Sequence, residues 1–579
     1  MTKIPLARYI FQRLRRYGVD HIHGVPGDNL LQALDHIAPA GSRWVGCCNE
    51  LNAAYAADGY ARVRGMGAVF TTMGVGELSA ANAVAGSQAE HVPVVHLVGV
   101  PSRAAMVGQS GYPKVMHHSL EPGGGLEPFC EIGRLLTQGR DEFRSTASVY
   151  GDMTAADFAS TFDSMLRRSF AQSKTMYFPL RADLVEEGVD SSGLEKSLDA
   201  PRQTLDNIPR ALREAKQPVI LVDRGLGMDA LSKEINELVR ISRVPTFCMP
   251  SGAGMIDNDL PNYHGVHSGP YGRIDSMDYV NSSDLVLAFG PMFSDTNTFR
   301  WKTVPTESKL MIVGTHTTRP KQSSLNSASP VIHEQVSKES LCRAIETIKQ
   351  NPIRPRAAKL IKDWRHRTPK SLRADEPINQ TDLYDKLSAY LRPHDTILVG
   401  NATPLLGARD FVLPRGARVI ASGQWFSIGH MLPAALGAAQ AKRGLEGERG
   451  LGRTILLDGD GSFQVTAQEL STIIAQRLDV TVFIFNNGGY AYERLIHGPD
   501  EEYNDVAPWS YLQLPRAFGA DRAWEEFGYE TQTHRVRTWA DLDALLAHDK
   551  FCTGPGLKMV ELILDRNDVP ERFRTLFRN

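Results

Sequence analysis

LDGDGSFQVTAQELSTIIAQRLDVTVFIFNNGGYAYE, residues 457–493, has the pattern of a strand, a helix and a second strand, with a polar turn after each strand. An apolar strand over 454–457 ends in a Gly-Asp-Gly turn, and the apolar run 480–485 ends in Asn-Asn-Gly-Gly. Between them, apolar residues from Val465 to Leu478 recur at helical spacing. Because open α/β sheets bind ligands at the carboxyl ends of neighbouring parallel strands, we expect both turns at one ligand-binding edge.

The residues of the two turns have the chemistry of a site for a metal ion and a phosphate group. Mg²⁺ takes oxygen ligands from carboxylates, amides, carbonyls and water, so Asp460 and Asn487 are suitable in type. Glycines let the backbone approach a phosphate, and the amino end of the helix after Gly461 adds N–H donors for an anion. Each turn alone is an ordinary loop sequence. The pair, at the ends of two strands joined by one helix, predicts a cradle for a diphosphate and its metal.

Length and composition favour a small-molecule enzyme or a soluble complex of several domains. A prior of roughly 150 residues per domain suggests about three or four domains for 579 residues. The net charge of −2, from 64 basic and 66 acidic residues, gives no electrostatic reason to expect nucleic acid or a membrane surface as a partner. Six cysteines without a C-x-x-C pair match neither a disulfide scaffold nor a zinc site, so we expect the reducing cytoplasm. Residues 6–17 resemble an amphipathic first helix more than a signal peptide.

Two acidic residues in the amino-terminal part follow predicted strands. Asp28 comes after the strand 21–24, and by itself it would be interpreted as the cap of the next helix, 29–37. Glu50 comes after the strand 44–48 and opens a helix of small residues, where a glutamate usually favours the helix amino end. Its apolar surroundings allow a second role, that of a carboxyl group able to hold a proton near neutral pH.

Several motifs resemble those of the thiamine-diphosphate-dependent 2-oxo acid decarboxylases, and especially the pyruvate decarboxylases. They are NELNAAYAADGYAR at 49–62, TTMGVGELSAANAVAGSQAEHVPVVHLVGVPS at 71–102, the histidine pair 117–118, the cradle, and NNGGYAYERLIHG at 486–498. The resemblance implies an α/β fold of three doubly wound parallel-sheet domains. We expect a pyrimidine-binding domain over 1–190, a middle structural or regulatory domain over 200–350, and a domain that binds the diphosphate and Mg²⁺ over 375–579.

The same resemblance implies the roles of individual residues. Glu50 would hydrogen-bond the N1′ nitrogen of the cofactor's aminopyrimidine ring. With Glu50, the catalytic residues would be those that handle protons: Asp28, His117, His118 and Glu493. Spacing alone would place Glu493 on a solvated helix face. The ligands of Mg²⁺ would be Asp460, Asn487 and the carbonyl of Gly489. Further cofactor contacts would come from Thr403, Ile428, Gly459, Gly461, Ser462 and Tyr490. Ile428 would be the bulky wedge between the two cofactor rings, although most isoleucines are core residues.

The implied activity is the non-oxidative decarboxylation of a 2-oxo acid, most simply pyruvate, to an aldehyde and CO₂, with thiamine diphosphate and Mg²⁺. The family's sites lie between subunits, so a homodimer or a dimer of dimers (a homotetramer) is expected. Three alternatives stay open: a carboligase that forms acyloins, a decarboxylase of a larger aromatic or branched 2-oxo acid, and a non-catalytic thiamine diphosphate sensor. The histidine pair with Glu493 favours protonation over capture of a second carbonyl.

Two features of the amino-terminal part fall outside these roles. Glu77 and Glu90 lie in the matching block 71–102, and we expect a structural or interface role for them rather than a catalytic one. The segment 121–145 is longer than its counterpart in the family and borders the predicted site, where it forms either a surface insertion or part of a lid.

Overall fold

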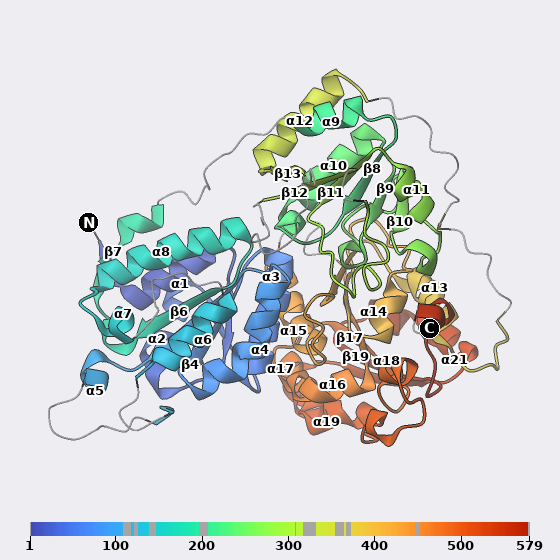
Figure 1. The fold of residues 1–579 in the computed structure, drawn as a ribbon. Helices are drawn as coiled ribbons and strands as arrows, with labels where there is room; N and C mark the ends of the chain where they lie inside the picture. The colour runs from blue at the N-terminus through green and yellow to red at the C-terminus, as the bar shows by residue number, and fades with distance from the viewer. Residues whose placement is uncertain are drawn as a thin grey trace. The chain divides into compact units, whose positions relative to one another are not determined.

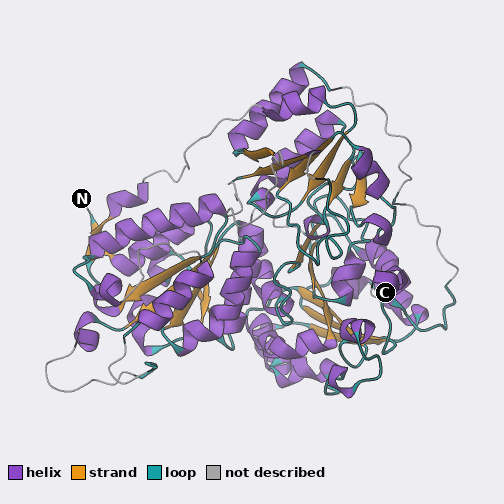
Figure 2. Cartoon of the chain, in the orientation of Figure 1, coloured by secondary structure: helices purple, strands orange, loops and turns teal. Residues whose placement is uncertain are grey.

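A computed structural model describes residues 2–107, 117–120, 125–137, 146–195, 207–306, 309–315, 332–353, 364–365, 372–445 and 452–576. These residues form three parallel β-sheets with helices on their faces and a small antiparallel ribbon of β1 and β7 (Figure 1, Figure 2). The predicted fold class, α/β with three parallel sheets, is confirmed.

Two compact units divide the chain. The first unit comprises Met1–Ala200, Gly429–Gly450 and Thr466–Leu478, and the second comprises Pro201–Ile428, Leu451–Val465 and Asp479–Asn579. Two segments of the predicted third domain thus group with the first unit, and the second and third sheets group together. The domain boundaries expected from the sequence stay predictions.

The first sheet has the strand order β3-β2-β4-β5-β6, and all of its pairs are parallel. β4 and β5 are buried along their whole length, as central strands covered on both faces are. The strands of the first unit are β1 Lys3–Pro5, β2 His21–Gly24, β3 Arg43–Gly46, β4 Gly67–Thr72, β5 Val94–Val100, β6 Met176–Arg181 and β7 Gly188–Asp190. Its helices are α1 Leu6–Arg16, α2 Leu31–Leu34, α3 Glu50–Arg64, α4 Val75–Ala89, α5 Arg103–Val107, α6 Glu127–Thr137, α7 Thr146–Tyr150, α8 Ala155–Gln172, α15 Met431–Arg443 and α17 Leu470–Ala475.

Helix α3 packs closely against α15 because small residues lie where the two helices meet. A Cβ added at Gly59 would lie 2.1 Å from the carbonyl O of Ala434, and one added at Gly437 would lie 1.8 Å from the carbonyl O of Ala56. A larger side chain at either glycine would push the backbones apart. The alanine-rich sequence of α3 therefore serves helix packing directly.

A buried carboxylate fastens the same helix pair. Asp58 is fully buried and accepts hydrogen bonds from Arg62 Nε at 2.6 Å, Ser87 Oγ at 2.8 Å and His430 Nε2 at 3.0 Å. Burial alone would raise the pKa of Asp58, but the Arg62 guanidinium and the His430 imidazole hold it well below its usual range. Removal of this carboxylate would take the 2.6 Å ion-pair partner from the buried Arg62 and a hydrogen-bond partner from the buried His430.

The second sheet has the order β10-β9-β8-β11-β12-β13, which is the 3-2-1-4-5-6 order of doubly wound folds. After β8, the buried Asp223 accepts hydrogen bonds from Ser251 Oγ at 2.5 Å and Asn297 Nδ2 at 2.8 Å, and Arg224 donates to the carbonyl O of Val419 at 2.6 Å. This turn fastens the second sheet to β15 (Arg418–Ala421) of the third sheet. The strands are β8 Pro218–Val222, β9 Thr246–Cys248, β10 Tyr263–Val266, β11 Leu285–Phe289, β12 Leu310–Gly314 and β13 Ile332–Gln335. The helices are α9 Asn207–Glu214, α10 Ser232–Ser242, α11 Met277–Ser282 and α12 Lys338–Gln350.

The third sheet has the order β15-β14-β16-β17-β19-β18, again with all pairs parallel. Its strands are β14 Thr396–Val399, β15 Arg418–Ala421, β16 Thr454–Gly459, β17 Val480–Asn486, β18 Thr531–Val536 and β19 Leu557–Ile563. The helices of this part are α13 Gln380–Tyr390, α14 Thr403–Ala408, α16 Asp460–Thr466, α18 Ala491–Ile496, α19 Leu514–Ala517, α20 Ala520–Phe527, α21 Trp539–Leu546 and α22 Asp549–Thr553.

The helix expected between β16 and β17 is broken. It consists of α16 and α17, separated by a 3₁₀ turn over Ala467–Glu469. Val465, which the sequence pattern placed on the buried stripe, lies before the break and is 41 % exposed, whereas Leu470, Ile473 and Ile474 are buried. In the described part of the chain, no helix has the length and apolar content that a membrane span requires.

Candidate active site

The two turns of the predicted cradle lie side by side at the carboxyl edge of the third sheet. β16 and β17 pair in parallel register as far as Gly459 and Phe485, and each strand ends within a residue of that pair. Asp460 is buried and joins the turns, because its Oδ1 accepts a hydrogen bond from the Gly461 N–H at 2.7 Å and its Oδ2 accepts one from the Gly489 N–H at 3.0 Å. A carboxylate from the first turn therefore fixes the backbone of the second.

The donor atoms of the cradle fit a hard cation beside a diphosphate. Burial raises the pKa of Asp460 to about 6, so a nearby cation would stabilise its ionised form. Asn487 is buried as well and supplies an amide oxygen, and Gly489 supplies a backbone carbonyl. A Cβ added at Gly459 or Gly488 would meet no described atom within 4 Å, which leaves open space in front of both turns. Three oxygen donors next to open space match the coordination that Mg²⁺ prefers.

Arg494 holds the second turn in place, a role that the sequence pattern did not predict. Its side chain is almost fully buried, and its Nη2 donates to the carbonyl O of Gly488 at 3.0 Å and to Asp505 Oδ1 at 2.6 Å. Gly489 has a φ of +146°, and a Cβ there would lie 2.1 Å from the carbonyl O of Asn504. The turn therefore requires glycine. In the sequence this arginine belongs to a polar helix face, and spacing does not distinguish a buried arginine from a solvated one.

A second buried carboxyl group, Asp458, lies at the end of β16. Burial raises its pKa to about 7, although the Ser462 hydroxyl donates a hydrogen bond to it. Among the described residues its Oδ2 has no hydrogen-bond partner. Ser462, predicted as a cofactor contact, thus makes an internal contact with Asp458 in this chain.

Three further predicted residues lie on the second unit. The ring of Tyr490 lies against the first turn, since a Cβ at Gly461 would be 2.5 Å from its Cε1. Glu493 is carried by α18 and is exposed, yet desolvation by the surrounding protein raises its pKa. Ile428 is 38 % exposed and is therefore not the core residue that its type suggests. This exposure is compatible with the predicted wedge.

The turn after β14 is strained where it precedes Thr403. Ala402 has a φ of +65°, a conformation that costs a non-glycine residue about 1–3 kcal/mol. Strained residues of this kind are found most often at functional sites. Thr403 is buried at the start of α14, and its carbonyl O accepts a hydrogen bond from Tyr384 Oη at 3.1 Å. Asn401 is buried too, and within the described chain its Oδ1 has no partner. The cofactor contact of Thr403 stays a prediction.

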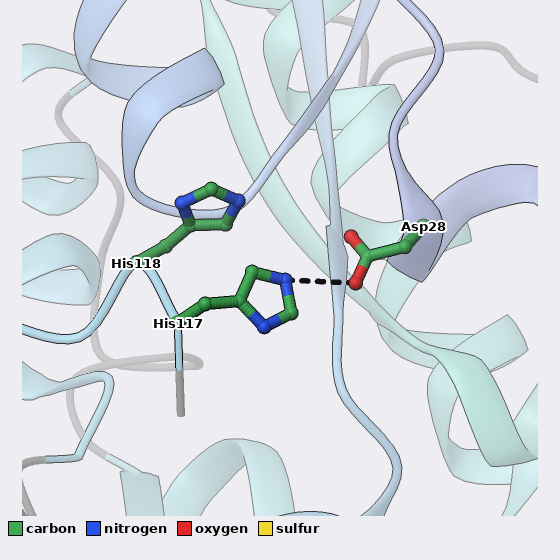
Figure 3. Close-up of side chains that lie close together, drawn as sticks. All are labelled: Asp28, His117 and His118. Carbon is green, nitrogen blue, oxygen red and sulfur yellow. Dashed lines mark ion pairs between the residues drawn. The ribbon is translucent and has the colours of Figure 1, made fainter. Parts of the chain in front are cut away.

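On the first unit, Asp28 and the histidine pair come together as a cluster (Figure 3). His117 Nε2 lies 2.8 Å from Asp28 Oδ2, and the His117 and His118 rings are 4.4 Å apart at 66°. Asp28 begins a short 3₁₀ turn and makes no side-chain cap, so the helix-cap interpretation does not apply. Both Asp28 and His117 are exposed.

The turn 74–76, which comprises the N-cap Gly74 and the first two residues of α4, touches two of the predicted catalytic residues. A Cβ added at Gly74 would lie 2.9 Å from both the Cβ and the carbonyl O of His118. One added at Gly76 would lie 3.1 Å from Glu50 Oε1. The absence of side chains at these two glycines therefore lets the turn fit against the histidine pair and against the carboxyl group of Glu50.

Glu77 holds this turn, and its structural role is as expected. Its Oε1 accepts a hydrogen bond from the Gly74 N–H at 2.8 Å, and its Oε2 accepts one from Tyr177 Oη at 2.9 Å. Burial raises the pKa of Glu77 to about 7. The described part of segment 121–145 forms α6, in which a Cβ at Gly133 would lie 2.5 Å from the Tyr177 ring. Residues 121–124 and 138–145 of that segment lie outside the described residues.

The predicted site residues are thus divided between the two units. The first unit carries Asp28, Glu50, His117 and His118. The second carries Thr403, Ile428, Gly459, Asp460, Gly461, Ser462, Asn487, Gly489, Tyr490 and Glu493. Sequence reasoning missed the supporting residues Arg494 and Asp458. It had no signal for them, because their importance comes from burial.

Comparison with known proteins matches three family models along the chain. They are the N-terminal TPP binding domain of thiamine pyrophosphate enzymes at residues 4–121, the central domain at 205–332 and the C-terminal TPP binding domain at 399–553. A pyruvate decarboxylase of Aspergillus parasiticus is 39 % identical, covering 100 % of this chain and 97 % of the relative. Pyruvate decarboxylase isozyme 3 of Saccharomyces cerevisiae is 36 % identical, over 99 % and 97 %. A pyruvate decarboxylase of Aspergillus fumigatus is 34 % identical, over 99 % and 96 %.

Proposed function

This chain belongs to the thiamine pyrophosphate enzyme family, and from that membership we propose that it decarboxylates pyruvate to an aldehyde and CO₂ without oxidation. The observation that carries the proposal is that whole-length similarity to pyruvate decarboxylases coincides with a cluster of Asp28, His117 and the partly buried His118. Histidine is the side chain best suited to proton exchange near neutral pH.

Thiamine diphosphate supplies, when bound, the electron sink that a departing CO₂ requires, because a 2-oxo acid alone has nowhere to delocalise the electron pair. Asp460, Asn487 and the carbonyl of Gly489 would hold Mg²⁺ beside the diphosphate, with Gly459, Gly461, Ser462 and Tyr490 around it. Ile428 and Thr403 would contact the rest of the cofactor. The buried oxygen donors and the open space before the turns support this assignment.

The acid–base residues of the chain would hold and move protons. The Glu50 carboxyl group, set against Gly76, would hold a proton at the pyrimidine nitrogen. Desolvation raises the pKa of Glu493, which supports its role as a proton donor near the substrate carboxylate. Asp28 orients His117 through the 2.8 Å contact, and His118 lies beside it, so this cluster would deliver the proton that the product acquires.

The assembly and the domain boundaries are part of the proposal. We take 1–190, 200–350 and 375–579 as the pyrimidine-binding, middle and diphosphate-binding domains. A homodimer or a dimer of dimers with sites at the subunit interface is proposed from the family resemblance. In such an assembly Glu50 would come from one subunit and the diphosphate cradle from the other. We also propose the cytoplasm as the location.

The test is an assay of the purified full-length protein with thiamine diphosphate, Mg²⁺ and a panel of 2-oxo acids that includes pyruvate, a branched and an aromatic compound. CO₂, free aldehyde and acyloin are measured for the wild type, for Glu50→Gln and for a matched control, Glu525→Gln, at an exposed position of α20. We expect turnover of pyruvate to aldehyde that is lost in Glu50→Gln and kept in Glu525→Gln.

Other outcomes identify the alternatives. Acyloin without free aldehyde would make the protein a carboligase, and a preference for the aromatic or branched substrate would change the substrate class. Binding of thiamine diphosphate without turnover of any substrate would indicate a sensor. Equal turnover by Glu50→Gln and the wild type would refute the proposed role of Glu50.

A further inference from the structure

The cluster of Asp28, His117 and His118 contains the donor set of a transition-metal site. One carboxylate oxygen and one nitrogen from each imidazole all lie within 4.8 Å of one another (Figure 3). Two imidazoles and a carboxylate are typical ligands of zinc and its neighbours in the first transition series. The exposure of Asp28 and His117 gives an ion access from solvent.

The backbone fixes the two imidazoles in one cluster. Adjacent residues of an extended chain point in opposite directions, but His118 has a φ of +67°, in the left-handed region. Its backbone and Cβ lie against Gly74, where a side chain would not fit. Glu77 in turn holds Gly74 by the 2.8 Å hydrogen bond to its N–H. The histidine pair is therefore presented by a supported turn, which lowers the cost of ordering it around an ion.

We propose that Asp28, His117 and His118 bind a divalent transition-metal ion such as Zn²⁺, and that the bound ion inhibits the enzyme. A tetrahedral site with Zn–N and Zn–O distances of roughly 2.0–2.2 Å has ligand atoms about 3.3 Å apart. The pair His117 Nε2 and Asp28 Oδ2, now 2.8 Å apart, would open by about half an ångström to admit the ion. The other donor distances, at most 4.8 Å, would shorten by side-chain rotation.

This site differs from the cradle in the ions that it selects. The cradle offers oxygen donors, which suit Mg²⁺, whereas two imidazole nitrogens favour Zn²⁺, Co²⁺, Ni²⁺ or Cu²⁺. Metal at the cluster would occupy the imidazole lone pairs and the Asp28 carboxylate, so these groups could no longer exchange protons. Inhibition rests on the proposed function, but binding of the ion does not.

The first experiment measures binding, using Co²⁺ as the probe. Full-length protein is loaded with thiamine diphosphate and excess Mg²⁺, then titrated with Co²⁺ while the visible d–d absorption is recorded, and Zn²⁺ affinity is measured by calorimetry. The variants are His117→Ala with His118→Ala, Asp28→Asn alone, and Asp460→Asn as the control that alters the cradle. We expect the wild type to bind one Co²⁺ per chain at this site. In the double-histidine variant the affinity for Co²⁺ should fall at least about tenfold, because loss of even an outer-shell partner has an effect of this size. Asp460→Asn should retain the affinity of the wild type.

Loss of binding in Asp460→Asn together with unchanged binding in the double-histidine variant would place the ion in the cradle and overturn the proposal. A site in the wild type that survives all three variants would overturn it as well. Circular dichroism and melting temperature show whether the double-histidine variant is folded. If it is not, the Co²⁺ affinity of Asp28→Asn tests the proposal instead, and we expect this affinity to be weaker than that of the wild type.

The second experiment measures inhibition with saturating Mg²⁺ and thiamine diphosphate. Zn²⁺ should reduce aldehyde production, and a chelator with low affinity for Mg²⁺ should restore it. A protein that binds Co²⁺ at the histidines but decarboxylates no 2-oxo acid would refute the proposed function and keep the metal site. An active decarboxylase whose Co²⁺ binding does not depend on the histidines would support the proposed function and refute the metal site.

Discussion

Replacement of Gly74 by alanine should displace His118 and reduce turnover. The added Cβ would lie 2.9 Å from the Cβ and the carbonyl O of His118. Because non-bonded carbon atoms pack best at about 3.5–4.0 Å, the two segments must separate by about 0.6 Å or more. A catalytic group misplaced by about 1 Å can cost 10²-fold in rate, so a shift of this size should lower kcat by about tenfold or more.

Gly65→Ala is the matched control for backbone strain. Gly65 ends α3 with a φ of +92°, so alanine is strained there as it is at Gly74, where φ is +68°. At Gly65 no described atom lies within 4 Å of the added Cβ, and the control therefore has strain without a clash. We expect about 1–3 kcal/mol of lost stability from strain in each variant, because both glycines lie in backbone regions that other residues rarely adopt. Only Gly74→Ala should also lose turnover.

The assay combines urea unfolding with steady-state kinetics on pyruvate at saturating thiamine diphosphate and Mg²⁺. Comparison at equal fractions of folded protein separates the catalytic effect from the loss of stability. If Gly74→Ala kept the kcat of Gly65→Ala, the close contact of the turn 74–76 with His118 would not position that histidine for catalysis.

Four further predictions concern single residues. Burial raises the pKa of Glu77 to about 7, above its ordinary value of 4.5, so Glu77 stabilises the fold at low pH and this contribution is lost as the pH rises through 7. The loss of unfolding free energy in Glu77→Gln, measured in urea, should therefore be larger at pH 5 than at pH 7.5. A loss that does not depend on pH would contradict this. Asp58→Ala should cost about 3–5 kcal/mol in urea unfolding, because Arg62 and His430 lose their buried partner, and a loss below about 1 kcal/mol would exclude that role. Ile428→Ala should cost less stability than the roughly 2–5 kcal/mol of a core isoleucine while weakening thiamine diphosphate binding in a cofactor titration. Asp460→Asn should abolish the rise in melting temperature that Mg²⁺ with thiamine diphosphate gives the wild type, and an unchanged rise would remove Asp460 from the metal site.

The local pattern predicted the sheet segments and the cradle well. β2 has the bounds predicted for the strand 21–24, and Asp460 and Asn487 follow adjacent parallel strands as expected. These features depend only on residues that are close in the sequence. In strands, apolar and polar residues alternate or the residues are continuously apolar, and glycines with Asp or Asn mark the turns. The resemblance then indicated the family and its cofactor, and the family-model matches confirm both.

The sequence pattern did not predict which side chains are buried or where a helix breaks, because tertiary packing decides both. The same residue types can be buried or solvated: Val465 fits a buried stripe but is exposed, and Arg494 fits a solvated face but is buried. Helix 460–475 is broken although its apolar spacing continues.

The supports of the proposed catalytic residues also join positions far apart in the chain. Glu77 bonds Tyr177, 100 residues away, and Asp58 bonds His430, 372 residues away. The sequence determined the cradle at 457–493, because a turn at the end of a strand is specified by its own residues. Only the tertiary structure determined that Gly74 and Glu77 support the histidine pair, because such contacts depend on where the packed core brings distant backbone together.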